Sequence, residues 1–241
     1  MVRYSRGLRP AIKDRKALAC AVGTDGENWQ TAVEALRDAL SHPNIEAADA
    51  TVVVSNHFVR YLLLPWNPAV VTLQEEMAYA RARFVHVFGE TAQDWVLQVS
   101  HARPGAPSVA SAIEPAFLQA VVALIAGSPL RMRSLQPCLM AVCNERVRLP
   151  AVDAWIAIAE AGRLLLGALR AGDWLSLRSR SLPGHAVGLA QIIEQEALLL
   201  GIEEGNKEIY LHQFSEAALD LKGLKVQDWL PRATARQMGR A

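Results

Sequence analysis

The sequence predicts a mixed α/β protein built from two related halves. Twice the chain runs through strands, an amphipathic helix of about four turns and a further strand, first over residues 2–54 and again over residues 154–212. A different αβ segment separates the two stretches. We therefore expect a duplicated unit in which each half is a mixed sheet covered by helices.

Composition favours an ordinary globular protein. Of 241 residues, 51% are apolar and 20% charged, which is enough apolar material for a core without disulfides or metals. The 25 basic and 24 acidic residues nearly balance, so no electrostatic footprint for nucleic acid is present. Charged residues interrupt the most apolar window, residues 151–172, so no run approaches the roughly 18 residues of a bilayer span. We expect a soluble, cytoplasmic chain without direct membrane insertion.

The first half is predicted to open with a β-hairpin whose charged turn is residues 13–16. Thr24 and Glu27 have the spacing of a capping box, and the apolar repeat behind them predicts a helix over residues 27–41. A β-branched run at residues 51–54 is typical of a central strand. The strands expected in this half are residues 2–12, 16–22, 51–54 and 57–64.

The separating segment begins with a second capping signal, Thr72 and Glu75, and its helix should end at Gly89. Pro104 and Gly105 occupy the positions that a type II turn favours, which predicts a hairpin. A further helix is expected to open at Pro115. The strands and helices expected here are residues 95–100, 108–113, 115–127, 130–135 and a short helix from Pro137.

The second half is predicted to begin with a β-meander. Three strands over residues 154–180 are separated by turns at residues 160–163 and 170–173. An apolar repeat over residues 189–200 then predicts a helix closed by Gly201, and a last strand follows. Beyond Leu221 the chain becomes basic and loses periodicity, so we expect a loosely held tail.

One segment carries a resemblance to known families. Residues 57–66 end in Leu64, Pro65 and Trp66, and Glu75 with a helix follows within about ten residues. This segment, with the order of elements behind it, resembles the actin-like assembly proteins of type IV pilus systems and the cytoplasmic domain of type II secretion protein L. The resemblance implies an actin-like, ribonuclease-H-like fold with an inserted αβ subdomain and a cleft between the halves. It also implies a scaffold that docks to an inner-membrane partner, and some relatives bind ATP.

The resemblance suggests a division of the chain. The first ribonuclease-H-like half, the inserted subdomain with its connecting elements, the second half and a basic tail would be residues 1–66, 67–150, 151–221 and 222–241.

A nucleotide site in this fold would use hairpin turns of the form Asp-x-Gly, whose backbone N–H groups hold phosphates. The first candidate turn contains Asp14 but neither a glycine nor a hydroxyl residue. The second, at Glu160 and Gly162, keeps an acid-x-Gly outline, but Arg163 and Leu164 stand where hydroxyl residues are expected. We therefore expect a degenerate site that hydrolyses nothing and needs no cofactor.

Three functional interpretations follow. The first is a non-catalytic scaffold that docks a small bitopic inner-membrane protein or an assembly ATPase, with Pro65 and Trp66 as the expected partner-binding residues because aromatic side chains dominate interface hot spots. Such a protein would reach the inner membrane only through its partner. The alternative is an ATP-binding ATPase or kinase-like phosphotransferase in which Asp14 and Glu160 hold Mg²⁺. A third interpretation is a self-associating homodimer.

Overall fold

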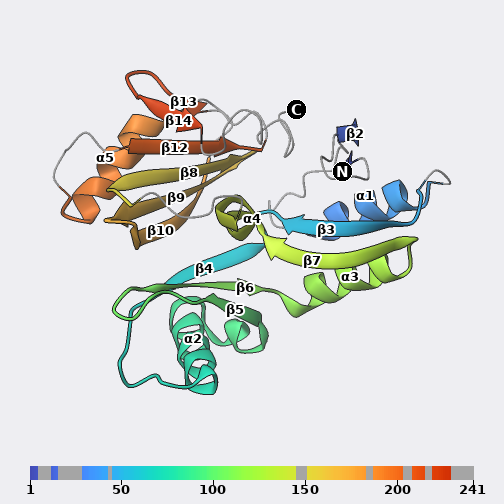
Figure 1. The fold of residues 1–241 in the computed structure, drawn as a ribbon, viewed down its shortest axis with the longest axis horizontal. Helices are drawn as coiled ribbons and strands as arrows, with labels where there is room; N and C mark the ends of the chain where they lie inside the picture. The colour runs from blue at the N-terminus through green and yellow to red at the C-terminus, as the bar shows by residue number, and fades with distance from the viewer. Residues whose placement is uncertain are drawn as a thin grey trace.

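The structure is a computed structural model, and it describes residues 1–4, 12–15, 29–42, 45–144, 151–182, 187–202, 208–214 and 219–228. In Figure 1 the described elements form three groups, the first half, an inserted unit and the second half. The chain leaves the first half for the inserted unit, returns to the first half and then enters the second half. The first half and the second half lie on either side of α4, and an inserted αβ unit lies below them in the view.

The first half is built on a parallel pair of strands, β3 and β7. Helices α1 and α3 pack against each other along this pair, and α3 contacts β7. A separate two-stranded sheet, β1 with β2, lies near the N-terminus. The elements of this half are β1 (Val2–Tyr4), β2 (Ile12–Arg15), α1 (Trp29–Leu40), β3 (Ala48–Val54), α3 (Pro115–Ala126), β7 (Leu130–Pro137) and the connecting helix α4 (Cys138–Asn144).

The inserted unit is a three-stranded antiparallel sheet of order β4-β6-β5 with α2 packed on it. Helix α2 begins with the expected capping box at Thr72 and Glu75 and ends at Gly89. At the hairpin tip, Gly105 has a φ of +88° and Ala106 N–H donates to Arg103 O, as the predicted type II turn requires. The elements are β4 (Val59–Leu64), α2 (Leu73–Phe88), the 3₁₀ helix η1 (Glu90–Asp94), β5 (Val96–Ser100) and β6 (Ser108–Ile113).

The second half is a five-stranded sheet of order β10-β9-β8-β12-β14. Its predicted meander is confirmed: β8, β9 and β10 pair antiparallel, and β12 pairs parallel with β8. Helix α5 covers one face, as Figure 1 shows. The elements are β8 (Ala154–Glu160), β9 (Arg163–Arg170), β10 (Asp173–Ser181), β11 (Val187–Gly188), α5 (Leu189–Leu199), β12 (Glu208–Gln213), β13 (Leu219–Asp220) and β14 (Val226–Asp228).

One order of elements occurs in both halves. In the first half α1 is followed by β3, which pairs parallel with β7, and in the second half α5 is followed by β12, which pairs parallel with β8 and β14. The sheets differ, because β3 and β7 form a two-stranded sheet apart from β1 and β2, whereas β12 belongs to a five-stranded sheet. The predicted duplication of the unit therefore stays a prediction.

The central core joins all three groups. Side chains of β8 alternate, with Ile156 and Ile158 facing the central core and Trp155 facing α5. Helix α4 lies in the middle of the molecule, where Leu139 and Val142 are buried. Because the strands of β8 and β9 are buried on both faces, their sequence is almost continuously apolar, as expected for internal strands.

The N-terminal hairpin differs from the sequence prediction. Strand β1 pairs with β2, and Arg3 lies opposite Asp14. Asp14 therefore lies in a strand, and the predicted turn at residues 13–16 is wrong. The prediction rested on a charge cluster, but an exposed two-stranded ribbon also accepts charged side chains on its faces. Three other predicted features lie outside the described residues: the second arm at residues 16–22, Thr24 and Glu27.

The expected C-terminal tail contains a strand at its start. Val226–Asp228 forms β14 and pairs parallel with β12, with Val226 packed against the second-half core. Three residues are too few to show a period in the sequence, and the strand exists because the edge of β12 supplies backbone partners. Residues 229–241 lie outside the described residues.

Candidate functional site

A tight turn between β3 and β4, residues 55–58, forms the centre of the candidate site. Phe58 N–H donates to Ser55 O at 3.0 Å, and His57 N–H donates to Ser55 Oγ at 3.2 Å. The side chain of Asn56 is fully buried, and its Oδ1 accepts a hydrogen bond from the Tyr61 hydroxyl at 2.8 Å. The turn is therefore held from within and from the strand that follows it.

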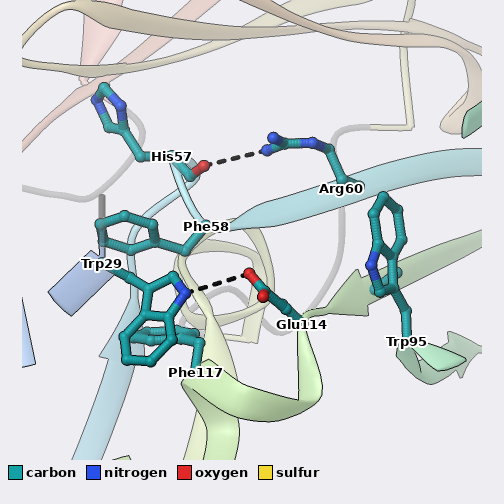
Figure 2. A pocket seen from close by; sticks show the side chains of 8 residues that line it. Trp29, His57, Phe58, Arg60, Trp95, Glu114 and Phe117 are labelled. Atoms are coloured by element: carbon teal, nitrogen blue, oxygen red, sulfur yellow. Dashed lines mark hydrogen bonds between the residues drawn. The ribbon is translucent and has the colours of Figure 1, made fainter. Parts of the chain in front are cut away.

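One side of this turn forms a wall of a small pocket between the first half and the inserted unit. Figure 2 shows Trp29, Phe58 and Phe117 gathered on one side, Trp95 facing them from the other, and Glu114 between. The pocket encloses about 80 Å³. It is lined by Trp29, His57, Phe58, Arg60, Trp95, Ala112, Glu114 and Phe117.

Ring contacts and two polar contacts shape the pocket. The Phe117 ring lies 5.1 Å from that of Phe58 and 5.7 Å from that of Trp29, between ring centroids. Trp29 Nε1–H donates to Glu114 Oε2 at 3.2 Å, and Arg60 Nη1–H donates to the backbone oxygen of His57 at 3.1 Å. Both contacts are drawn in Figure 2.

The volume limits what the pocket can hold. Sites for small organic ligands usually enclose at least about 300 Å³, so this pocket suits a single side chain. Its aromatic walls favour an apolar group. The guanidinium of Arg60 and the carboxylate of Glu114, which also line it, can form hydrogen bonds with a peptide backbone.

The other side of the turn contacts the β8–β9 turn of the second half. Asn56 N–H donates to Glu160 Oε2 at 2.9 Å. His57 Nε2 lies 2.9 Å from Ala161 O, and because a carbonyl oxygen only accepts, Nε2 carries the proton. A β-carbon at Gly162, whose φ is +74°, would lie 3.9 Å from His57 Cε1. The β3–β4 turn thus sits directly on the turn that was predicted to hold phosphate.

Buried polar groups surround this contact. Burial raises the pKa of the Tyr61 phenol well above its usual value, and the nearby Cys138 thiol and Glu160 carboxylate add to the rise. Burial also raises the pKa of Cys138, again with a contribution from Glu160, while the Asn56 side chain acts in the opposite direction. Cys138 therefore stays a neutral thiol and is no nucleophile at neutral pH.

The structure separates the residues that the sequence proposed for a nucleotide site. Glu160 and Gly162 share the β8–β9 turn, as predicted, whereas Asp14 lies in β2, in a different sheet. Whether any of the three binds nucleotide stays a prediction. The carboxylate of Glu160 already accepts a hydrogen bond from inside the protein.

Pro65 and Trp66 lie just after β4 and are not among the residues that line the pocket. Both are exposed, with 51% of Trp66 accessible. Val71 and Leu73, at the start of α2, are exposed as well, so the stretch from Pro65 to Leu73 presents several apolar side chains to solvent. Their role in partner binding stays a prediction.

No pattern in the sequence predicted the pocket. Its lining comes from α1, the β3–β4 turn, β4, the residue between η1 and β5, the end of β6, the N-cap of α3 and α3 itself, which are far apart in the chain. The nearest signal was the aromatic side chains themselves, but Trp29 and Phe117 also fit the apolar faces of their helices.

Comparison with known proteins rests on structure. No family model and no curated protein sequence matches the chain. The chain superimposes on the cytoplasmic domain of EpsL, an inner-membrane component of the type II secretion system of Vibrio cholerae, with a TM-score of 0.52 at 11% identity, over 85% of this chain and 78% of that one. This chain has the fold of cytoplasmic EpsL.

A second similar structure is the PilM–PilN type IV pilus biogenesis complex, with a TM-score of 0.50 at 18% identity. The match covers 84% of this chain and 62% of the matched chain, so this chain spans less than two thirds of it. The actin-like α/β fold predicted from the sequence is thereby confirmed, as is the resemblance to these two groups. Within the described residues, no helix is both long and apolar enough to cross a bilayer.

Proposed function

We propose that this protein is a non-catalytic, actin-like scaffold of a type IV pilus or type II secretion-like assembly, which docks a segment of a bitopic inner-membrane protein. One observation carries the proposal. Glu160 Oε2 and Ala161 O of the predicted phosphate turn are bonded to the protein's own β3–β4 turn, while the aromatic pocket on the other side of that turn is an open cavity. The geometry thus favours recognition of a partner over nucleotide chemistry.

The partner is proposed to place one apolar side chain in the pocket. Deep aromatic pockets with a few polar groups at their rim are where interface energy concentrates. The fold likeness to the PilM–PilN complex supports a membrane-anchored partner by analogy. Exposed Trp66 would supply a second contact outside the pocket.

Affinity capture tests the proposal. Tagged full-length protein is incubated with detergent-solubilised native membranes, and bound proteins are identified by mass spectrometry. We expect a protein with a single membrane span, and we expect Glu114→Ala and Trp66→Ala each to weaken its recovery about tenfold, the scale of a lost interface anchor.

Two matched variants serve as controls. Glu194→Ala removes an exposed glutamate from α5, and Leu198→Ala removes an apolar side chain that is 83% exposed on the same helix. Both should capture the partner as the unchanged protein does. Capture that lacks any single-span protein, or that ignores Glu114→Ala and Trp66→Ala alike, would overturn the proposal.

Calorimetric titration with Mg-ATP separates this function from the ATP-binding alternative. We expect no binding heat up to millimolar nucleotide in protein whose fold is verified by circular dichroism, because Glu160 is already bonded to Asn56. Micromolar binding that Glu160→Ala abolishes would instead establish the nucleotide-binding function.

A further inference from the structure

We propose that residues 55–58 act as a two-sided positioning turn, through which the second half sets the shape of the docking pocket. The inference rests on the proposed function, because it concerns the regulation of that same pocket. Asn56 and Glu160 are positioning residues in this scheme and do not line the pocket, whereas His57 both lines the pocket and bonds to Ala161.

The two sides of the turn face different groups. The backbone N–H of Asn56 and the imidazole of His57 bond to Glu160 and Ala161 of the second half. Phe58 and the backbone oxygen of His57 face the other way, toward Phe117 and Arg60. Figure 2 shows the His57 imidazole pointing away from the aromatic side chains of the pocket.

The β3–β4 turn is too rigid to absorb a displacement of the β8–β9 turn. Its ends are joined by the hydrogen bond from Phe58 to Ser55, and the fully buried Asn56 side chain is bonded to Tyr61 of β4. Movement of the β8–β9 turn therefore has to move Phe58 and the acceptor of Arg60 together, because packed and hydrogen-bonded segments shift as units.

The contact of Arg60 with His57 links the turn to the pocket. Arg60 lines the pocket, and its guanidinium is held in place by His57 O. A shift of His57 therefore changes the position of the Arg60 guanidinium in the pocket. A ligand or partner that displaces the β8–β9 turn would weaken docking at a site it does not touch, which is the defining property of coupled sites.

Fluorine NMR tests the first link directly. The full chain is labelled with fluorinated tryptophan, and its six tryptophan signals are assigned by single Trp→Phe substitutions. Glu160→Ala removes the acceptor of Asn56 N–H, whereas Glu160→Gln keeps an acceptor oxygen. We expect Glu160→Ala to shift or broaden the signals of Trp29 and Trp95, which line the pocket, and to leave that of Trp66 unchanged. Glu160→Gln and the exposed-site control Glu194→Ala should leave all three signals in place.

Partner capture tests the second link. Glu160→Ala should lower recovery of the single-span partner about fivefold or more, and Glu160→Gln should restore it. If Glu160→Ala fails to fold, Glu160→Asp takes its place, because the shorter side chain draws the acceptor away from Asn56 N–H and residue 160 does not line the pocket.

Two results would overturn the coupling. One is an unchanged pair of signals for Trp29 and Trp95 in Glu160→Ala. The other is full partner capture by Glu160→Ala while Glu114→Ala loses it, and this result would leave the docking function itself intact. Loss of capture in neither Glu114→Ala nor Trp66→Ala would instead refute the docking function.

Discussion

Asn56 shows how much one buried polar side chain can determine in this protein. Its backbone N–H reaches Glu160 in the second half, and its side chain accepts from Tyr61 in the inserted unit. Both Asn56 and Tyr61 are buried, and the Tyr61 hydroxyl donates its proton to Asn56 Oδ1. A single residue therefore connects two parts of the fold at the point where the pocket begins.

Replacing Asn56 by Ala should destabilise the protein by about 1–3 kcal/mol, because the Tyr61 hydroxyl loses its acceptor in a buried place. Urea unfolding followed by circular dichroism measures the change. Asn144→Ala, which removes an exposed amide bonded to Gln136, is the matched control and should cost within about 0.5 kcal/mol. Equal effects of the two substitutions would contradict the importance of the buried pair.

At the scale of elements, the start of α2 is the clearest case of local sequence determining local structure. Thr72 Oγ1 accepts from Glu75 N–H at 3.2 Å, and Glu75 Oε2 accepts from Thr72 N–H at 2.9 Å. Glu75 also accepts from Val71 N–H at 3.0 Å. These bonds satisfy N–H groups that the first turn of a helix leaves without partners, and they hold the exposed apolar stretch before α2 in one conformation.

Thr72→Ala should lower stability by about 1 kcal/mol, the usual cost of losing a cap side chain. Thermal or urea unfolding measures the loss, and Thr91→Ala, whose hydroxyl makes only a 3.5 Å contact in η1, is the control with little effect.

The bonds from Thr72 and Val71 also lower the pKa of Glu75. A lowered folded-state pKa means that this contribution is present above the usual glutamate range and is lost as pH falls through the folded value. The cost of Glu75→Gln should therefore vanish in acid, and a cost that grows in acid would contradict the capping role.

At the scale of the whole molecule, one apolar core links the three groups of elements. It includes Val33 of α1, Tyr61 of β4, Leu139 of α4 and Ile156 of β8, all buried. The inserted unit has its own smaller core around Phe84, but its strands β4 and β6 also face the central one. The halves and the insert are thus expected to stabilise one another.

This shared core predicts a single unfolding transition. Circular dichroism, which follows the sheets and helices, and tryptophan fluorescence should give the same urea midpoint, because removing any group exposes apolar surface of the others. A separate early transition for the inserted unit, visible in fluorescence from Trp66 and Trp95 alone, would show that its own core is sufficient.

Much of the fold could be predicted because its signals are local. The capping box at Thr72, the type II turn at Gly105 and the short turns of the meander each lie within a few neighbouring residues, and each appears where the sequence predicted it. The period of apolar residues placed α1, α3 and α5 for the same reason. Backbone geometry and side-chain spacing decide such features before any distant contact forms.

What only the tertiary structure decided depends on contacts between residues far apart in the chain. The hydrogen bond between Asn56 and Glu160 joins residues 104 positions apart, and that between Trp29 and Glu114 joins residues 85 positions apart. No local pattern therefore predicts either contact. The same holds for Asp14, whose strand depends on β1 as its partner, and for β14, which depends on the edge of β12. Sequence alone determined the longer helices, the meander strands and the fold class, because hydrophobic period and turn chemistry act locally. Packing decided the pocket and the contact between the β8–β9 turn and the β3–β4 turn, because burial and long-range hydrogen bonds bring distant segments together.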